Sequence, residues 1–399
     1  MKILQVCKKF PYPPKDGEMI AIFNFSESFL ALGHELTLLS LNTNKHYYNI
    51  KNLPQNIKNK IDFEAIDINT NINFFNALSS FIHNTPYNID RFYSVDFDEK
   101  IIELLSKNTY DLILLEGLPL LLYVSTFKKY STAHISYRAH NVEYEIWERL
   151  SNNATNFVKK KYYKLLSKQV KDFEKNNIPK VDSVVTISER DASILKSITN
   201  IKSNYTAPAC ISPNNIHINS SQTSYNSLFF LGALDWLPNL EGIEWFIQDV
   251  FPLVINKMPD TIVYIAGRNT PEKIKHYSNK NIIVLGEIDD ISKYMNAHQI
   301  MIVPLLSGGG MRIKIIEAML YGKTIVSTSI GAEGIADENS IIRCDNATIF
   351  AEACINMLAN KNKQIELGDK AKQVASKKYT ALNVTRNLLS FYNQTFNIH

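Results

Sequence analysis

The residues best suited to chemistry lie between Pro304 and Met319, in the segment PLLSGGGMRIKIIEAM. An apolar run before this segment predicts a strand, and the spacing of apolar residues after it predicts a helix. Between them, Ser307 is followed by Gly308, Gly309 and Gly310, and three glycines let a ligand approach the backbone closely. The start of the helix adds free N–H groups and a partial positive charge, which suit a phosphate.

Charged side chains follow this glycine run. Arg312 can bind phosphate through two parallel hydrogen bonds, and Lys314 supplies a point charge. A carboxylate repels phosphate, so Glu317 is a better acceptor for the hydroxyl groups of a ribose. The segment therefore predicts a phosphate site with a neighbouring ribose-binding acid. The alternative is a glycine turn followed by a solvated helix face.

The elements that position this segment alternate between strands and helices along the whole chain. Residues 3–7 predict a strand, 18–32 a helix that ends at Gly33, and 35–41 a second strand, which together form a β-α-β unit of a parallel sheet. Further strands are expected at residues 111–116, 134–138, 183–187, 227–231, 261–266, 281–285, 299–304 and 324–328.

A stretch rich in Ser, Asn and Pro at residues 211–226 interrupts this alternation and predicts a linker. We therefore expect two α/β domains, at residues 1–210 and 227–379. A final helix within about 380–399 is expected to return to the first domain.

Composition excludes several classes of protein. The chain has 399 residues, 45% of them hydrophobic, and a formal net charge of +4, which fits a folded globular protein and is too mild to indicate a nucleic-acid partner. None of the four cysteines, Cys7, Cys210, Cys344 and Cys354, has C-x-x-C spacing, so neither zinc nor a redox dithiol is predicted. No export signal or apolar run long enough to span a bilayer is present, and we expect a cytoplasmic protein.

The sequence resembles the retaining GT-B glycosyltransferases of family 4. The segment PLLSGGGMRIKIIEAMLYGKTIVSTSIGAEGI is similar to their donor site, and LGALDW at 231–236 is similar to the opening of the second domain in one bacterial branch. AHNVE at 139–143, TISE at 186–189 and KFPYPPKDG at 9–17 are similar to first-domain motifs. The resemblance implies two Rossmann-like domains facing across a cleft.

Roles carry over from this resemblance residue by residue. Glu317 matches the acid that binds ribose, His140 the histidine near the transferred sugar, and Gly17 the glycine that faces the diphosphate. Asp16 and Glu143 fall on the acceptor side. Glu143 is expected to orient His140, to bind acceptor, or simply to cap the next helix.

The sequence departs from the family pattern at two places. Gly309 stands where the family usually has a second glutamate, so backbone groups of Gly309 and Gly310 are expected to contact the sugar instead. Asp235, Trp236 and Asn239 stand near where members often carry cations, so diphosphate binding is assigned to Arg312 and Lys314. The donor-binding set is completed by Asp235, by Ser307 and Gly308, and by Ile288, which lies in a loop expected to select the base.

The activity implied is transfer of a sugar, with retention, from a nucleotide-diphosphate sugar to a glycan or lipid-linked glycan in the synthesis of a surface polysaccharide, lipopolysaccharide or protein glycan. The sequence has no D-x-D pair at a strand end, so neither a metal nor a cofactor is predicted. Alternatives are a non-catalytic GT-B-like binding protein and a GT-B epimerase or phosphorylase. A dinucleotide oxidoreductase is disfavoured, because no G-x-G-x-x-G follows the first strand.

One helix predicts a further partner independently of the family. Between residues 157 and 175, lysines recur every three or four positions and share a helix face that could contact anionic lipid at the inner surface of the cytoplasmic membrane. The alternative is an ordinary solvated face. These lysines are Lys160, Lys164, Lys168, Lys171 and Lys175.

Overall fold

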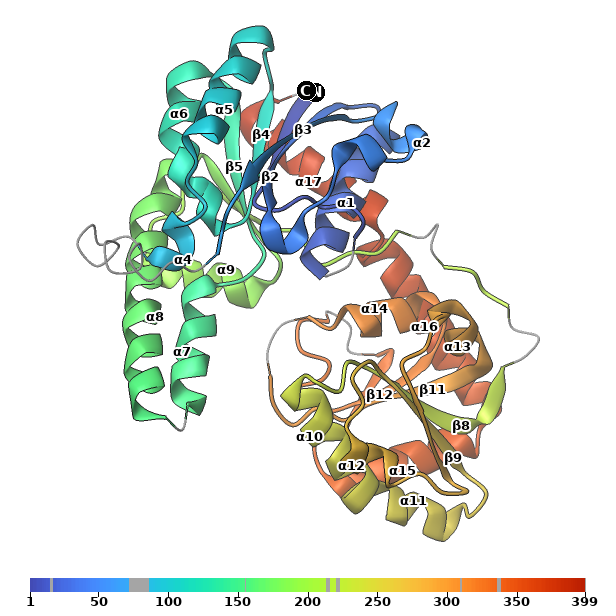
Figure 1. Cartoon of the computed structure of the whole chain (residues 1–399). Coiled ribbons are helices and arrows are strands. Elements are labelled where there is room, and N and C mark those ends of the chain that lie inside the picture. The colour runs from blue at the N-terminus through green and yellow to red at the C-terminus, as the bar shows by residue number, and fades with distance from the viewer. Residues whose placement is uncertain are drawn as a thin grey trace. The chain divides into compact units, whose positions relative to one another are not determined.

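The computed structural model describes residues 1–14, 17–71, 86–154, 156–212, 216–219, 223–308, 311–335 and 339–398. The chain divides into two compact units (Figure 1). The first unit comprises residues 1–208 together with 384–399, and the second comprises residues 209–383. None of the helices in the described ranges is long and apolar enough to cross a membrane.

The first unit contains a seven-stranded sheet with the order β3-β2-β1-β4-β5-β6-β7, and neighbouring strands are all parallel. The order reverses between β1 and β4, as in a Rossmann fold, and this is where such sheets bind ligands. The strands are β1 (Lys2–Cys7), β2 (Glu35–Thr43), β3 (Asp62–Ile68), β4 (Leu112–Glu116), β5 (His134–Ala139), β6 (Ser183–Thr186) and β7 (Asn204–Thr206).

Serine side chains cap the N-termini of two helices of the first unit. Ser94 accepts a hydrogen bond from the backbone of Phe97, and Ser188 accepts one from Asp191, at the N-termini of α5 and α9. The helices are α1 (Gly17–Ala31), η1 (Asn44–His46), η2 (Ile50–Asn52), α2 (Gln55–Lys58), α4 (Tyr87–Asp90), α5 (Val95–Lys107), η3 (Leu118–Tyr123), α6 (Val124–Tyr130), α7 (Glu143–Asn153), α8 (Phe157–Asn177), η4 (Ile178–Lys180) and α9 (Glu189–Ile198).

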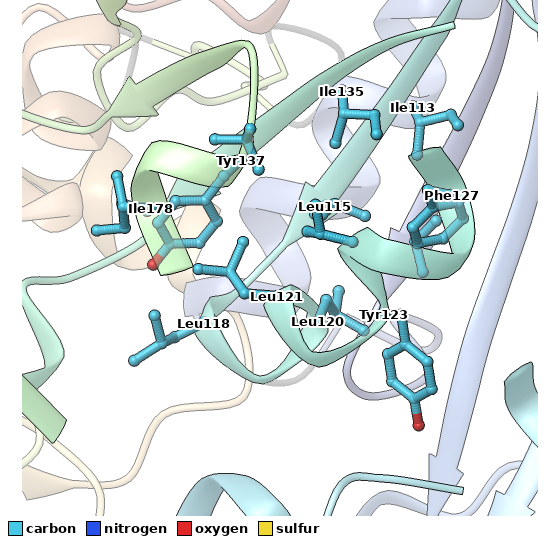
Figure 2. Close-up of a cluster of buried hydrophobic side chains, with 14 of the residues drawn as sticks. Ile113, Leu115, Leu118, Leu120, Leu121, Tyr123, Phe127, Ile135, Tyr137 and Ile178 are labelled. Atoms are coloured by element: carbon cyan, nitrogen blue, oxygen red, sulfur yellow. The ribbon is translucent and has the colours of Figure 1, made fainter. Parts of the chain in front are cut away.

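Side chains alternate between the two faces of the sheet along β4 and β5. Ile113, Leu115, Ile135 and Tyr137 point into the cluster shown in Figure 2, where Phe127 of α6 also packs. The residues between them point to the opposite face. The side chains of Glu116, the last residue of β4, and of Arg138, its neighbour on β5, therefore lie on that face.

The second unit contains a six-stranded parallel sheet with the order β10-β9-β8-β11-β12-β13, which again reverses beside its first strand. The two Rossmann-like units confirm the predicted fold class. The strands are β8 (Ser224–Leu231), β9 (Ile262–Ala266), β10 (Ile282–Gly286), β11 (His298–Val303), β12 (Thr324–Ser327) and β13 (Ile341–Arg343), and the helices are α10 (Leu237–Trp245), η7 (Phe246–Val250), α11 (Phe251–Lys257), α12 (Glu272–Lys275), α13 (Ile291–Ala297), α14 (Ile313–Leu320), α15 (Ala347–Leu358) and α16 (Lys361–Lys378).

Some boundaries differ from those predicted. β8 begins at Ser224, within the stretch 211–226 that its Ser and Asn content predicts to be linker, because pairing with β11 extends the strand. β3, β7 and β13 were not predicted. β7 and β13 have only three residues each, too few for a period-two pattern to stand out, and much of β3 is half-exposed.

The C-terminal helix α17 (Ala381–Phe396) enters the first unit from Val384 onward, which confirms the predicted return. Leu388 and Tyr392 are fully buried there. The hydroxyl of Tyr392 donates a hydrogen bond of 2.7 Å to the hydroxyl of Ser136 on β5, and Phe391 stacks on Tyr205 with ring centroids 5.0 Å apart. The first unit therefore depends on chain from both ends of the sequence.

We predict that Leu388→Ala lowers the free energy of unfolding by about 2–5 kcal/mol, because it leaves a cavity between α17 and the rest of the first unit. Asn387→Ala, an exposed change on the same helix, should shift it by less than about 0.5 kcal/mol. Urea unfolding followed by circular dichroism measures both. An equal loss of unfolding free energy in the two variants would contradict the role given to α17.

Candidate functional site

The first group of candidate residues gathers where β1, β4 and β5 end. These strands are adjacent and parallel, so their carboxyl ends lie at one edge of the sheet. β4 ends at Glu116, which pairs in register with Arg138 on β5, and His140 follows one residue after β5. Arg138 and His140 are two positions apart, so both side chains lie on the face that carries Glu116.

A buried carboxylate is the centre of this group. Glu116 is fully buried, and its Oε2 lies 2.8 Å from Nε2 of His140. Nη1 of Arg138 lies 3.3 Å from each carboxylate oxygen, and Nε2 of Gln5 donates to Oε1 over 2.8 Å. The hydroxyl of Ser26 on α1 donates a hydrogen bond of 2.6 Å to Oε1 of Gln5. Every one of these side chains is buried.

The hydrogen-bond partners of Glu116 keep its carboxylate ionised. Burial alone would raise the pKa of Glu116, but the Arg138 guanidinium and the His140 hydrogen bond outweigh that effect and lower the pKa to about 2. An ionised carboxylate only accepts hydrogen bonds, so Nε2 of His140 must carry the proton. Nδ1 is then the imidazole nitrogen that Glu116 does not engage.

A second ionic group surrounds the start of α1. Glu18 lies 3.2 Å from Nζ of Lys8 and 3.1 Å from Nζ of Lys9, the two residues that follow β1. Although burial opposes it, the lysines and His140 lower the pKa of Glu18. Gly17 is the exposed first residue of this helix. The predicted acceptor-side residue Asp16 lies outside the described residues.

Glu143 does not orient His140, because the hydrogen-bond partner of the imidazole is Glu116. The Glu143 carboxylate instead lies 3.9 Å from Nζ of Lys8. The backbone N–H of Glu143, at the start of α7, donates to Oε1 of the buried Glu174 over 2.9 Å. Burial raises the pKa of Glu174 to about 8. Glu174 therefore caps α7. The expectation that Glu143 orients His140 is wrong, because Glu116 takes that role.

The second group lies after β11 and continues into α14. Ser307 donates a hydrogen bond of 2.9 Å to Oε2 of Glu241 on α10. Gly308 has φ +100°, a left-handed conformation that favours glycine. Gly309 and Gly310 lie outside the described residues. Arg312 is the N-cap residue of α14, and its guanidinium lies 4.8 Å from the ring centroid of Trp236.

The remaining two charged candidates form an ion pair on α14. Nζ of Lys314 lies 2.8 Å from Oε2 of Glu317, one helical turn away. Lys314 is more exposed than Glu317, with 40% against 19% of the side chain accessible. Their neighbours Ile315 and Ile316 are fully buried and anchor the helix. The sequence places both charges on the helix but does not predict that they pair.

The loops after β8, β9 and β10 complete this edge. Asp235 accepts a hydrogen bond of 2.9 Å from Asn269 and lies 3.9 Å from Nε of Arg268. Ile288 follows β10 and packs partly buried against the core of the unit. Arg268 is a cation that the sequence analysis missed. Its position two residues after a predicted strand was the signal that could have revealed it.

Each unit thus gathers its own candidate residues at the carboxyl edge of its own sheet. The first holds Gly17, His140 and Glu143, and the second holds Asp235, Ile288, Ser307, Gly308, Arg312, Lys314 and Glu317. The sequence analysis missed Glu116, Arg138 and Gln5. A charge that ends the apolar run LILLE was the available signal for the first of these.

Metal-ligand clusters are absent from the described part of the chain, where no three His, Cys, Asp or Glu side chains meet in a suitable group. None of the four cysteines forms a disulfide, and all four are buried.

This chain is similar to several known proteins. Residues 225–360 match the protein-family model described as "Glycosyl transferases group 1". An uncharacterized 44.6 kDa protein in the cps region of Klebsiella pneumoniae is 23% identical over 397 residues, which cover 96% of this chain and 97% of that protein.

Solved structures extend the likeness to both units. Sucrose-phosphate synthase from Thermosynechococcus elongatus has a TM-score of 0.69 at 13% identity, with 100% of each chain covered. HepE from Anabaena, solved in complex with UDP-glucose, has a TM-score of 0.62 at 10% identity, with 99% of this chain and 100% of that one covered. The chain therefore has the GT-B fold, and most of its second unit matches the glycosyltransferase group 1 model.

We predict that Glu116→Gln lowers the free energy of unfolding by about 3–5 kcal/mol, because it leaves the buried Arg138 charge without its counter-ion. The lowered pKa of Glu116 also makes stability depend on pH. The ionised carboxylate contributes on the order of 3 kcal/mol above its unfolded pKa, and this is lost as the pH falls towards about 2.

Urea unfolding at pH 7 and at pH 3 measures both effects. The wild type should lose more stability on acidification than Glu116→Gln does. Glu148→Gln, an exposed change on α7, is the control and should follow the wild type. If Glu116→Gln lost as much stability as the wild type between these pH values, Glu116 would not be the group that titrates.

Proposed function

We propose that this protein transfers a sugar from a nucleotide-diphosphate sugar to a glycan or lipid-linked glycan, with retention of configuration at the anomeric carbon. The observation that carries this proposal is the segment after β11. It joins a glycine turn, the guanidinium of Arg312 and the Lys314–Glu317 pair at the start of one helix. This segment lies inside the region that matches the glycosyltransferase model.

Donor binding is assigned to the second unit. Arg312, Lys314 and the N-terminus of α14 would hold the diphosphate, since the cations and the helix end all attract negative charge. Glu317 would accept hydrogen bonds from the ribose once the diphosphate has drawn Lys314 away. That HepE was solved with UDP-glucose supports a nucleotide sugar as the donor. Asp235, Ser307, Gly308 and Ile288 complete the donor set, and Gly309 and Gly310 would contact the sugar through their backbone groups.

The transfer breaks the bond between the anomeric carbon and a diphosphate oxygen. A bond forms from the acceptor hydroxyl oxygen to that carbon on the same face, and the leaving diphosphate takes the hydroxyl proton. Negative charge grows on the diphosphate, so stabilising it is the main catalytic task. Arg312 and Lys314 would perform it, with the backbone of Gly17. His140, held by Glu116, would hydrogen-bond the transferred sugar through Nδ1, and Asp16 and Glu143 would lie towards the acceptor.

The cps-region protein of Klebsiella pneumoniae supports a role in the synthesis of a surface polysaccharide, because it is similar to this chain along nearly its whole length. The second candidate is a non-catalytic GT-B-like protein that binds a sugar or a partner. Gly309 is the observation that favours it, because the family usually has an acid at this position. Turnover of a nucleotide sugar separates the two candidates.

We predict that UDP, GDP or ADP raises the stability of the wild type, by about 2.7 kcal/mol at 100 times its Kd. With the sugar nucleotide of that base, Arg312→Ala should lower turnover by ~100-fold, the typical loss of a transition-state donor, and Lys314→Ala should act in the same direction. Glu317→Gln should instead raise KM, by the equivalent of about 1–3 kcal/mol. Thermal shift and initial rates measure these effects.

Lys280→Ala, an exposed change in the second unit, is the control. Donor binding without turnover of any sugar nucleotide would favour the non-catalytic candidate. Full turnover by Arg312→Ala at saturating donor would remove this residue from the catalytic machinery.

We also propose that helix α8 contacts the anionic inner face of the cytoplasmic membrane. Its five regularly spaced lysines are all exposed. Phe157 and Val158 at its start are apolar yet 67% and 74% exposed, and Tyr162 and Leu165 are exposed as well. Such a helix can attract lipid headgroups with its lysines while apolar side chains enter the interface. Lys171 also lies 4.8 Å from the ring of Tyr144, which ties the basic face to α7.

We predict that the wild type sediments with vesicles of phosphatidylcholine and phosphatidylserine, and much less with phosphatidylcholine alone. Replacing Lys160, Lys164 and Lys168 by alanine should weaken this binding at least tenfold, at about 1 kcal/mol per lysine. Replacing Lys361, Lys370 and Lys377, three exposed lysines of α16, by alanine changes the net charge equally and is the control. Equal losses in both triple variants would mean that α8 is only a solvated face.

A further inference from the structure

Two helix N-termini of the second unit meet through a tryptophan and an arginine. Trp236 is the N-cap residue of α10, and Arg312 is the N-cap residue of α14. Neither side chain caps its own helix. The guanidinium of Arg312 instead lies 4.8 Å from the ring centroid of Trp236, so that the cation rests on the aromatic face.

The surrounding backbone is shaped to allow this contact. A Cβ on Gly308 would lie 3.0 Å from Nη2 of Arg312 and 3.2 Å from Cη2 of Trp236, closer than side chains normally approach. A Cβ on Gly242 of α10 would clash with the carbonyl oxygen of Pro304 at the end of β11. Glycines therefore let α10 and the loop after β11 approach each other, and this brings the indole to the guanidinium.

The contact restrains a long side chain. The Nε and Nη2 atoms of Arg312 are shielded from solvent. Arginine binds phosphate along the edge of its planar group, whereas it stacks through its face. A guanidinium already held over the ring of Trp236 therefore loses less entropy when a phosphate arrives. Lys314 lacks such support, because it is half-exposed and pairs with Glu317.

We propose that Trp236 is a positioning residue, which holds the Arg312 guanidinium over its ring in a position to bind the diphosphate of the donor. This inference rests on the function proposed above. Trp236 is 38% exposed, so the competing hypothesis is that its ring stacks directly on the nucleobase. The two hypotheses differ in whether the effect of Trp236 passes through Arg312.

A double-mutant cycle distinguishes them. Calorimetry should measure Kd for UDP, GDP and ADP with the wild type, and the diphosphate that binds most tightly should then be used with Trp236→Ala, Arg312→Ala and the double variant. We expect Trp236→Ala to weaken binding about 3- to 20-fold in the wild-type background, from the usual strength of a shielded cation–π contact. In the Arg312→Ala background the same change should cost less than about twofold.

Two further measurements exclude a general structural effect. Trp236→Phe should keep most of the affinity and Trp236→Leu should not, because only an aromatic ring attracts the cation. The nucleoside monophosphate of the same base should lose less affinity than the diphosphate. Thermal unfolding checks that each variant is folded. We expect all of them to be folded, because Trp236 is partly exposed.

Gly308→Ala tests the packing itself. Its Cβ should displace the guanidinium, so diphosphate binding should weaken in the wild-type background and change little in the Arg312→Ala background. Gly33→Ala is the matched control, because Gly33 has φ +84° but no neighbouring atom within 4 Å of an added Cβ. It should leave diphosphate binding unchanged.

The outcomes separate failure of this inference from failure of the proposed function. If no nucleoside diphosphate binds the wild type, both are wrong. If one binds but Trp236→Ala costs the same with and without Arg312, or weakens monophosphate and diphosphate equally, Trp236 does not act through Arg312 and only the inference is overturned.

Discussion

The parallel pairing of strands is the constraint on which both candidate groups depend. Every named strand pair in the described part of each sheet is parallel, so the loops that follow the strands all emerge at one edge of that sheet. In each unit the strand order reverses beside the first strand, which opens space between the two loops there. Residues more than 70 positions apart, such as Trp236 and Arg312, therefore meet without any direct chain connection.

The two units handle charge in different ways. The first unit buries an ionised carboxylate and matches it with the guanidinium of Arg138, the imidazole of His140 and the amide of Gln5. A network of this kind is rigid, because breaking any contact would leave a buried polar group unsatisfied. The second unit leaves Lys314 half-exposed in a pair with Glu317 that a competing anion can open. One arrangement suits holding a ring in a fixed orientation, and the other suits binding and releasing a charged ligand.

Sequence patterns predicted the fold well and the sites only in part. The long apolar strands could be predicted because burial on both faces leaves a continuous apolar run, and α17 could be predicted as a helix because burial along one stripe leaves a helical period. Three-residue strands such as β7 and β13 leave none. For the site, glycines and cations after β11 were evident in the sequence. The partners of those residues were not, because they depend on which strands lie side by side: Glu116 meets His140 only because β4 and β5 are neighbours. Orienting the histidine was one of three roles that the AHNVE resemblance suggested for Glu143, and the register of β4 and β5 places Glu116 against His140 instead.

The loop after β8 carries no cation of its own, yet cations from other loops lie beside it. This loop carries an acid and an indole, Asp235 and Trp236, which cannot themselves bind phosphate. Each of them instead lies beside an arginine from a different loop, Arg268 after β9 and Arg312 before α14. An acid 3.9 Å away and an aromatic face 4.8 Å away both favour a guanidinium, one through charge and the other through its quadrupole. The positive charge at this edge of the sheet therefore comes from neighbouring loops, and the loop after β8 contacts the arginines that carry it. Replacing Trp236 is then expected to act on how Arg312 is held, because the indole itself carries no charge.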